Sequence, residues 1–202
     1  SNGLSSDDNT KILSKMHNTV KKMIRRGEFV RRGVLRDNER IESEVDKMKI
    51  IGLIGGMSWE SSLEYYRLVN AGVKARLGGL HSAKCVLVSV DFAEIEALQS
   101  SARWVEAGQC MAEAAQSLER AGAEGVVLCT NTMHKLVGQI EAAVRIPSLH
   151  IADATAEKVR AAGLSRVGLL GTRFTMEQDF YAGRLRERHG LEVLTPPEAE
   201  RE

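Results

Sequence analysis

The sequence predicts an α/β protein built on a parallel sheet that is flanked by helices. Short apolar segments rich in β-branched residues alternate with segments of helical periodicity, a pattern typical of β-α-β units. Of the 202 residues, 43% are hydrophobic, which is enough for one complete core. The stretch that starts at Gly52 resembles the stretch that starts at Gly168, which indicates that a second, similar domain begins after the first.

The strands and helices are expected in regular alternation after Met48. The first strand, in the segment KIIGLIG, ends at Gly55 and Gly56, and a glycine pair at 78–79 ends the first helix. The buried face of this helix is expected to consist of its periodic apolar residues: Trp59, Leu63, Tyr66, Val69, Val73 and Leu77. Further strands are expected at 85–90, 125–129, 147–151, 166–171 and 191–195, and helical regions at 93–121, 132–143, 153–162 and 175–189.

The domain organisation has three expected parts. Residues 1–47 carry 11 basic and 8 acidic residues and form a basic, partly helical N-terminal extension. Residues 48–164 form the first α/β domain, and residues 165–202 form the beginning of a second, incomplete one. The internal repeat has an offset of 116 residues, so the counterpart of Cys129 would lie near position 245, beyond the last residue. We therefore expect exposed apolar surface after Arg166 and self-association.

The composition excludes several classes of protein. A net charge of +1, from 28 basic and 27 acidic residues, gives no field that would recruit nucleic acid or an anionic membrane. No stretch approaches the roughly 20 apolar residues of a membrane span. The three cysteines are odd in number and unpaired in spacing, which argues against a disulfide framework and a zinc site and fits a cytoplasmic location. The expected partner is a small molecule, with no metal.

Cys129, in the segment LCTNTMH, is the candidate reactive residue. It ends an apolar strand, and the next segment is expected to be a helix capped by Thr130, Asn131 or Thr132. A helix N-terminus lowers a thiol pKa and binds carboxylates, so one location could both activate a thiolate and hold an anion. The alternative is a buried cysteine that packs as a small apolar group. Cys85 and Cys110 are interpreted as core residues.

Several motifs together resemble one family. The segments IGLIGGMSWESSLEYY, GGLHSA, SVDF, AGAEGVVLCTNTMHK, PSLHIADAT and LLGTRFTMEQDFY follow in the same order as in the cofactor-independent aspartate/glutamate racemases, over about residues 49–197. The resemblance implies two similar α/β domains with the active site between them, and no cofactor. It also implies a cytoplasmic, often dimeric isomerase of D-amino acid metabolism that acts on glutamate, aspartate or a similar amino acid.

The resemblance also implies the chemistry and the site residues. Inversion needs a base and an acid on opposite faces of the substrate α-carbon, and this family uses two cysteines, one from each domain. Cys129 matches the cysteine of the first domain. The implied substrate-binding residues are Met57, Gln99, Thr130, Asn131, Thr132 and Thr172. Arg103 is a candidate for holding a distal carboxylate, and His134 and His150 are interpreted as hydrogen-bonded structural residues.

One departure from the family pattern keeps alternatives open. The second cysteine motif is absent, so racemisation by this chain is expected to be impaired. A non-catalytic module that binds a carboxylate or small molecule, or an inactive racemase fragment, is the alternative. Nucleotide binding through GLIGG is less favoured, because the full GxGxxG pattern is missing.

Overall fold

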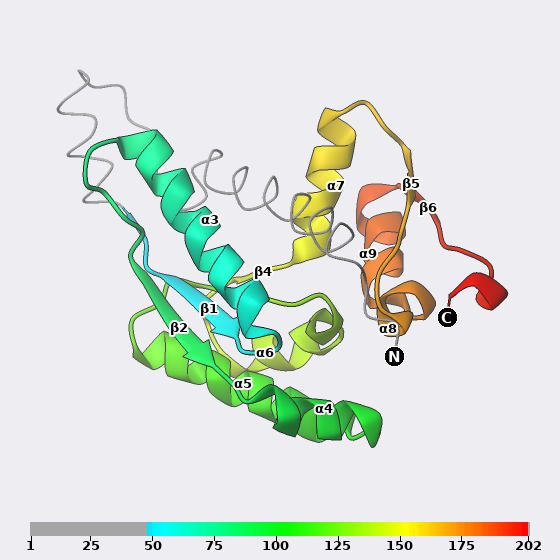
Figure 1. Cartoon of the computed structure of the whole chain (residues 1–202), viewed down its shortest axis with the longest axis horizontal. Helices are drawn as coiled ribbons and strands as arrows, with labels where there is room; N and C mark the ends of the chain where they lie inside the picture. The colour runs from blue at the N-terminus through cyan, green and yellow to red at the C-terminus, as the bar shows by residue number, and fades with distance from the viewer. Residues whose placement is uncertain (1–47, 202) are drawn as a thin grey trace.

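A four-stranded parallel sheet lies between helices in the left part of the molecule in Figure 1. The computed structural model describes residues 48–201, so the expected extension at 1–47 lies outside the described residues. The strand order is β2-β1-β3-β4, and β1 is buried along its whole length, as its continuous apolar sequence predicts. The strands are β1 (Ile51–Gly55), β2 (Cys85–Ser89), β3 (Gly125–Leu128) and β4 (Ser148–Leu149).

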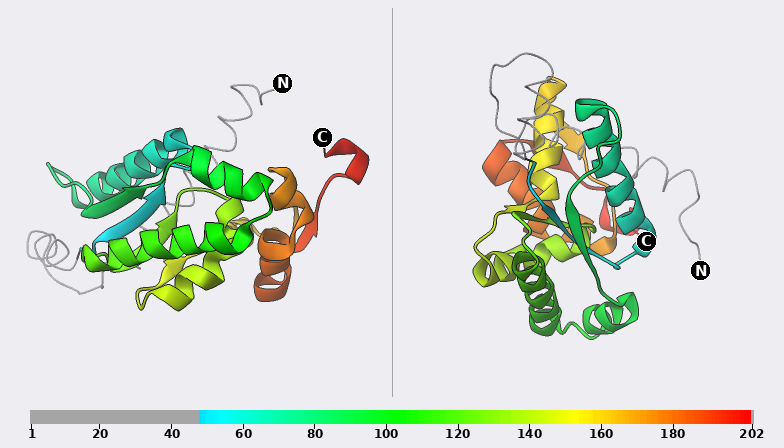
Figure 2. Two further views of the ribbon diagram at one scale, coloured as in Figure 1. Left: turned by 90° about the horizontal axis from the view of Figure 1, so that it is seen from below. Right: turned by 90° about the vertical axis from the view of Figure 1, so that its left-hand side faces the viewer.

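Helices cover both faces of this sheet, which confirms the predicted α/β class (Figure 2). One face packs against α3, and the other packs against α4, α5 and α6. The predicted helical region 93–121 is interrupted near Ala102, which has a positive φ of 55°. The helices are α3 (Trp59–Leu77), α4 (Phe92–Ser100), α5 (Trp104–Arg120) and α6 (Val137–Ala143), and a 3-10 turn, η1 (Thr132–Leu136), precedes α6. None of the helices between residues 48 and 201 combines the length and apolar character that crossing a bilayer requires.

The predicted buried face of α3 was wrong in its first half. Trp59, Leu63 and Tyr66 are 65%, 59% and 48% exposed. The reason is a close contact at the start of the helix, where the Ser62 hydroxyl accepts the backbone N–H of Gly56 at 2.9 Å. The small side chain of Ser62 therefore faces the sheet and rotates the larger apolar residues away from it. The residues that do face the sheet side are Ser62, Tyr65, Leu68, Val69, Gly72, Val73 and Leu77.

A second, smaller group of elements follows the four-stranded sheet. Two parallel strands, β5 and β6, form their own sheet, and α7 packs with α9 in a common core. The repeated segments at Gly52 and Gly168 thus both fold as a strand, a helical region and a parallel strand, although Gln178, which has an extended backbone, divides the second helical region. The elements are α7 (Ile151–Ala161), β5 (Arg166–Gly168), α8 (Arg173–Glu177), α9 (Asp179–His189) and β6 (Glu192–Leu194), with a 3-10 turn at Glu198–Glu200.

The turn between β1 and α3 has no room for a side chain at Gly56, and we expect this position to be sensitive to substitution. Gly56 has φ of +94°, and an added Cβ would lie 2.0 Å from the carbonyl oxygen of Val90. Gly56→Ala should therefore lower the free energy of unfolding by about 3 kcal/mol or more in urea titrations. The control is Gly190→Ala, at φ of +64° with open space around it, which should lower it by only about 1 kcal/mol. Equal losses in the two variants would show that the contact with Val90 is unimportant.

Candidate functional site

Cys129 lies directly after β3, at the carboxyl end of the central sheet. Its backbone N–H donates to the carbonyl of Ile54 at 2.9 Å, which extends the ladder between β1 and β3 by one residue. Its side chain is 0% exposed and belongs to the core cluster beneath α3, with Tyr65 and Leu68. The sheet therefore fixes the position of the thiol, as the sequence predicts.

The electrostatic environment of Cys129 differs from the expectation. Burial raises the pKa of its thiol to about 12, whereas a helix N-terminus was expected to lower it. No regular helix N-terminus stands directly after the thiol, because the next segment begins as the 3-10 turn η1 and becomes α-helical only at Val137. Asn131 occupies the capping position but makes no side-chain cap hydrogen bond. One irregular turn aligns few peptide dipoles, so desolvation dominates and the thiol is protonated at neutral pH.

The other two cysteines are half-buried rather than fully buried. Cys85 opens β2 and packs at the edge of the α3-side cluster, and Cys110 packs against the α5-side cluster. Burial also raises the pKa of Cys85. The interpretation of both as core residues therefore holds only in part, and Cys129 is the most buried of the three.

Two of the predicted binding residues meet across the junction of the two sheets. The hydroxyl oxygens of Thr132 and Thr172 lie 3.3 Å apart, although 40 residues separate them in the sequence. Thr172 also caps α8, because its hydroxyl accepts the N–H of Thr175 at 3.4 Å. Thr130 and Asn131 are half-buried in the same turn as Thr132. The turn after β3 therefore meets the segment after β5 through Thr132 and Thr172.

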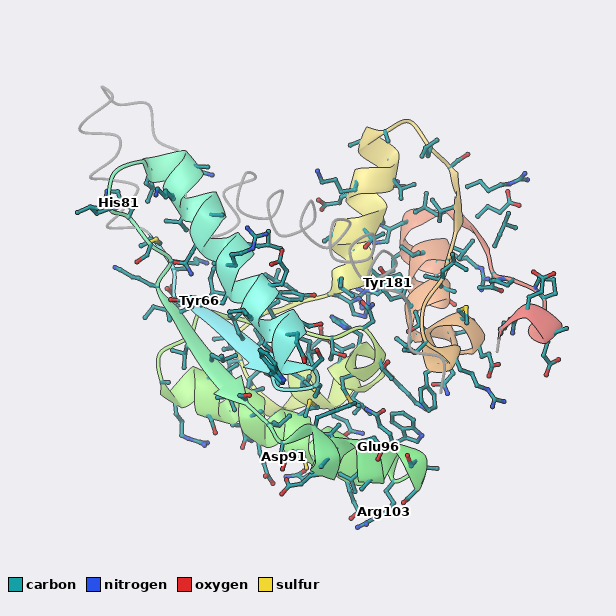
Figure 3. All side chains as sticks on the ribbon, in the orientation of Figure 1. Tyr66, His81, Asp91, Glu96, Arg103 and Tyr181 are labelled. Carbon is teal, nitrogen blue, oxygen red and sulfur yellow. The ribbon has the colours of Figure 1, made fainter. Side chains whose placement is uncertain are left out.

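Met57 and Gln99 lie on the other side of the sheet from the Cys129 side chain. Met57 is buried in the α5-side cluster. The Gln99 side-chain amide lies 4.0 Å from the sulfur of Met133, a buried residue of η1. Gln99 thus contacts Met133 directly, and Met57 belongs to the same cluster as Met133 rather than to the cluster that holds Cys129. Arg103 is exposed, lies at the lower edge of the molecule and pairs with Glu106 (Figure 3).

Two histidines that the sequence analysis treated as structural lie directly behind the turn. The Nδ1 atom of His134 lies 2.8 Å from the carbonyl of Thr130, and its Nε2 accepts the N–H of Ile151 at 3.2 Å. A neutral ring satisfies both contacts only when Nδ1 carries the proton and donates to Thr130. The His150 ring lies 4.5 Å from the His134 ring, and its Nδ1 accepts the N–H of Ala152.

Burial keeps both imidazoles neutral. It lowers the pKa of His134 to about 4, although the hydrogen bond to Thr130 acts in the opposite direction. It lowers the pKa of His150 to about 3. Repulsion from a protonated His134 and from the Arg184 guanidinium lowers this pKa further. The two rings therefore act as hydrogen-bonding groups rather than as charges, which confirms the structural interpretation.

A charged network that the sequence analysis missed lies beside these rings. Arg184 donates to both carboxylate oxygens of Asp153, at 2.7 and 2.6 Å, and the His189 ring lies 2.9 Å from one of them. Burial acts to raise the pKa of Asp153, but the hydrogen bonds from Arg184 and His189 outweigh it and lower this pKa to about 2. The network joins α7 to α9. Charged residues spaced along two helices carry no signal in the sequence that they will meet.

Aromatic residues make a second contact between the two groups of elements. The rings of Trp104 in α5 and Phe174 in α8 meet edge to face, with centroids 5.2 Å apart. The Lys135 ammonium lies 3.9 Å from the centre of the Trp104 ring. Tyr181, labelled between α7 and α9 in Figure 3, shares a hydrogen bond of 2.9 Å with Thr155.

Within residues 48–201, no group of three or more His, Cys, Asp or Glu side chains is arranged to hold a metal ion.

The low pKa of His134 predicts a loss of stability in mild acid. The unfolded chain takes up a proton on this ring near pH 6.5, whereas the folded protein does so only near pH 4. Between these values the unfolded state binds more protons, so the free energy of unfolding falls as the pH falls. The contribution of His134 should be about 2 to 3 kcal/mol between pH 7 and pH 4.5, measured by urea unfolding.

His134→Asn should therefore reduce the pH dependence over this range. His81→Asn, in the loop before β2 and outside this cluster, is the matched control and should leave it unchanged. If His134→Asn keeps the pH dependence of the parent protein, His134 is not the group that causes the loss of stability in mild acid.

Comparisons with known proteins agree with this geometry. The family model for Asp/Glu/Hydantoin racemases matches residues 54–202. A structure from Yersinia pestis assigned to the Asp/Glu racemases is 61% identical, with a TM-score of 0.74. An aspartate racemase homologue from Pyrococcus horikoshii is 35% identical, with a TM-score of 0.65. In both comparisons the match covers 76% of this chain and 67% of the other.

A more distant structure shares the fold. The aspartate racemase of Picrophilus torridus is 22% identical, with a TM-score of 0.60, and the match covers 75% of this chain and 64% of that one. The chain therefore belongs to the Asp/Glu/Hydantoin racemase family, and its enzyme class is that of the racemases.

Proposed function

We propose that this protein is a cofactor-independent amino acid racemase in which Cys129 transfers a proton at the substrate α-carbon. The observation that carries the proposal is the position of Cys129 at the carboxyl end of β3, directly before a turn whose Thr132 meets Thr172. Ligands of parallel α/β sheets bind at this end of the strands.

The two threonines suit the substrate carboxylate. Their hydroxyls are 3.3 Å apart, close enough for one carboxylate to accept a hydrogen bond from each. Removal of the α-proton places negative charge next to this carboxylate, and donors aimed at it stabilise the carbanion. We propose that Thr130, Asn131, Thr132 and Thr172 provide these contacts, and that Met57 and Gln99 shape the pocket from the α5 side.

The raised pKa of Cys129 assigns it the role of acid in the free protein. A thiol with a pKa of about 12 donates a proton and does not act as a base at neutral pH. The α-ammonium group of a bound amino acid is a cation, and a cation beside a thiol favours the thiolate. We therefore propose that substrate binding itself prepares Cys129 to act as a base.

A second proton-transfer group is needed on the opposite face of the α-carbon. Neither other cysteine is suitably placed: Cys110 lies on α5, and Cys85 pairs with Ile51, about 10 Å before Ile54 along the strand direction. We propose that residues 48–164 and 165–202 belong to two similar domains, and that this chain exchanges the α-proton faster than it inverts the centre.

The relatives suggest the substrate and the setting. Two of the similar structures are an aspartate racemase and an aspartate racemase homologue, so we propose aspartate or glutamate as the substrate. The exposed side chains of Trp59, Leu63 and Tyr66 on α3 support self-association. The three free cysteines support a reducing, cytoplasmic location.

One observation favours a second candidate, a non-catalytic module that binds a carboxylate. Cys129 is fully buried, whereas the Thr172 hydroxyl lies on an exposed residue next to Thr132. In such a module the threonines would bind the ligand and the thiol would take no part.

Proton exchange in D2O tests the proposed reaction. L- and D-aspartate and glutamate are incubated with the protein, the α-proton signal is followed by NMR, and the enantiomer ratio is followed by chiral separation. We expect exchange to exceed inversion, and Cys129→Ser to slow exchange at least about 100-fold. Cys110→Ser is the matched control and should retain the exchange rate. Exchange that survives in Cys129→Ser would exclude this thiol as the transferring group.

The threonine contact is tested by binding. Thr172→Val removes the hydroxyl and should weaken aspartate or glutamate binding about tenfold in calorimetric titrations. Thr172→Ser keeps both the hydroxyl and the cap on α8, and should bind like the parent protein. Binding that depends on Thr172 without any proton exchange would favour the carboxylate-binding module, and unchanged binding in Thr172→Val would exclude this contact.

A further inference from the structure

His134 connects two parts of the chain that the proposed reaction needs to keep in place. It is only 1% exposed, and both ring nitrogens are engaged with backbone groups. One of these groups is the carbonyl of Thr130, the residue next to Cys129. The other is the N–H of Ile151, the first residue of α7.

The bond to Ile151 satisfies a group that the helix leaves without an internal partner. The first N–H groups of an α-helix have no acceptor within the helix, and a buried one requires an acceptor from elsewhere. His134 supplies that acceptor, and His150, the N-cap of the same helix, packs against its ring. The start of α7 and the turn after Cys129 are therefore held by one side chain.

The same helix packs within the second group of elements. Asp153 in the first turn of α7 forms a two-pronged ion pair with Arg184 of α9, and Tyr181 of α9 bonds to Thr155 of α7. A shift of α9 would move α7, and through His134 it would also move the carbonyl next to Cys129.

We propose that His134 is a positioning residue that fastens the turn after Cys129 to the first turn of α7, and thereby controls solvent access to the thiol. Its functional significance rests on the role of Cys129 proposed above, whereas the fastening itself does not. Thr130 follows Cys129 directly, so we expect loss of the bond to its carbonyl to release the turn and to give solvent access to the adjacent thiol without unfolding of the core.

Alkylation of individual cysteines tests this proposal without any need for turnover. The full chain is treated with iodoacetamide at fixed pH, and the modification rate of each cysteine is followed by peptide mass spectrometry. In the parent protein, Cys129 should react more slowly than Cys85 and Cys110, which are half-buried. His134→Leu, which loses both hydrogen bonds, should accelerate Cys129 at least about tenfold, the factor expected from one buried hydrogen bond.

The two other cysteines separate positioning from general destabilisation. A variant that merely unfolds more often would accelerate all three thiols together, and this result would overturn the proposal. Selective acceleration of Cys129, with the other two rates within about twofold of the parent, would support it.

A conservative variant identifies the bond that matters. His134→Asn places an amide donor near the position of Nδ1 and should restore most of the protection of Cys129 through Thr130. His134→Ala, which also loses both hydrogen bonds, serves as the test if His134→Leu does not fold. The matched control is His150→Asn, which can still cap α7 through its side-chain oxygen and should leave Cys129 protected. Acceleration of Cys129 in His150→Asn as large as in His134→Leu would overturn the proposal.

The two proposals fail in different ways. Absence of proton exchange in D2O counts against the proposed reaction and leaves the alkylation rates unaffected. Alkylation rates that do not change in His134→Leu count against the fastening, whether or not the protein exchanges substrate protons.

Discussion

The hydrogen bond from the N–H of Cys129 to the carbonyl of Ile54 continues the central ladder one residue beyond β3, and the rest of the site depends on it. Because side chains alternate along a strand, Leu128 points into the α5-side core and Cys129 points beneath α3. A longer connection would leave the direction of the thiol to a loop. Here the sheet sets it, and the turn after it begins from a fixed point.

Burial shifts the pKa values of the groups around this point in opposite directions. It raises the pKa of the Cys129 thiol and lowers the pKa of the His134 ring, because a charged form of either group would lose its hydration. Both groups are therefore neutral at neutral pH. Asp153 remains charged in the same region because Arg184 and His189 satisfy its oxygens. The site is therefore built largely from neutral donors and acceptors, with one compensated charge behind them.

The sequence was sufficient to predict the class of fold, the strands and the position of Cys129, because these follow from short-range periodicity and composition. It was insufficient for the buried face of α3, since that face depends on the contact between Ser62 and the backbone of Gly56. It also gave the wrong direction for the Cys129 pKa, because the turn after the strand is a 3-10 turn in a fully buried setting. The pairing of Asp153 with Arg184 depends on how two helices pack, which periodicity along each helix does not encode.

The contact of Trp104 with Phe174 and Lys135 has a spectroscopic consequence. The chain contains two tryptophans, and the other, Trp59, is largely exposed to water on α3. Trp104 lies where α5, η1 and α8 meet, with a cation over its ring and an aromatic edge beside it. Its emission therefore depends on the separation of the two groups of elements, whereas that of Trp59 does not. With Trp59 replaced by phenylalanine, the protein would contain a single tryptophan, placed at the boundary where its two parts approach each other.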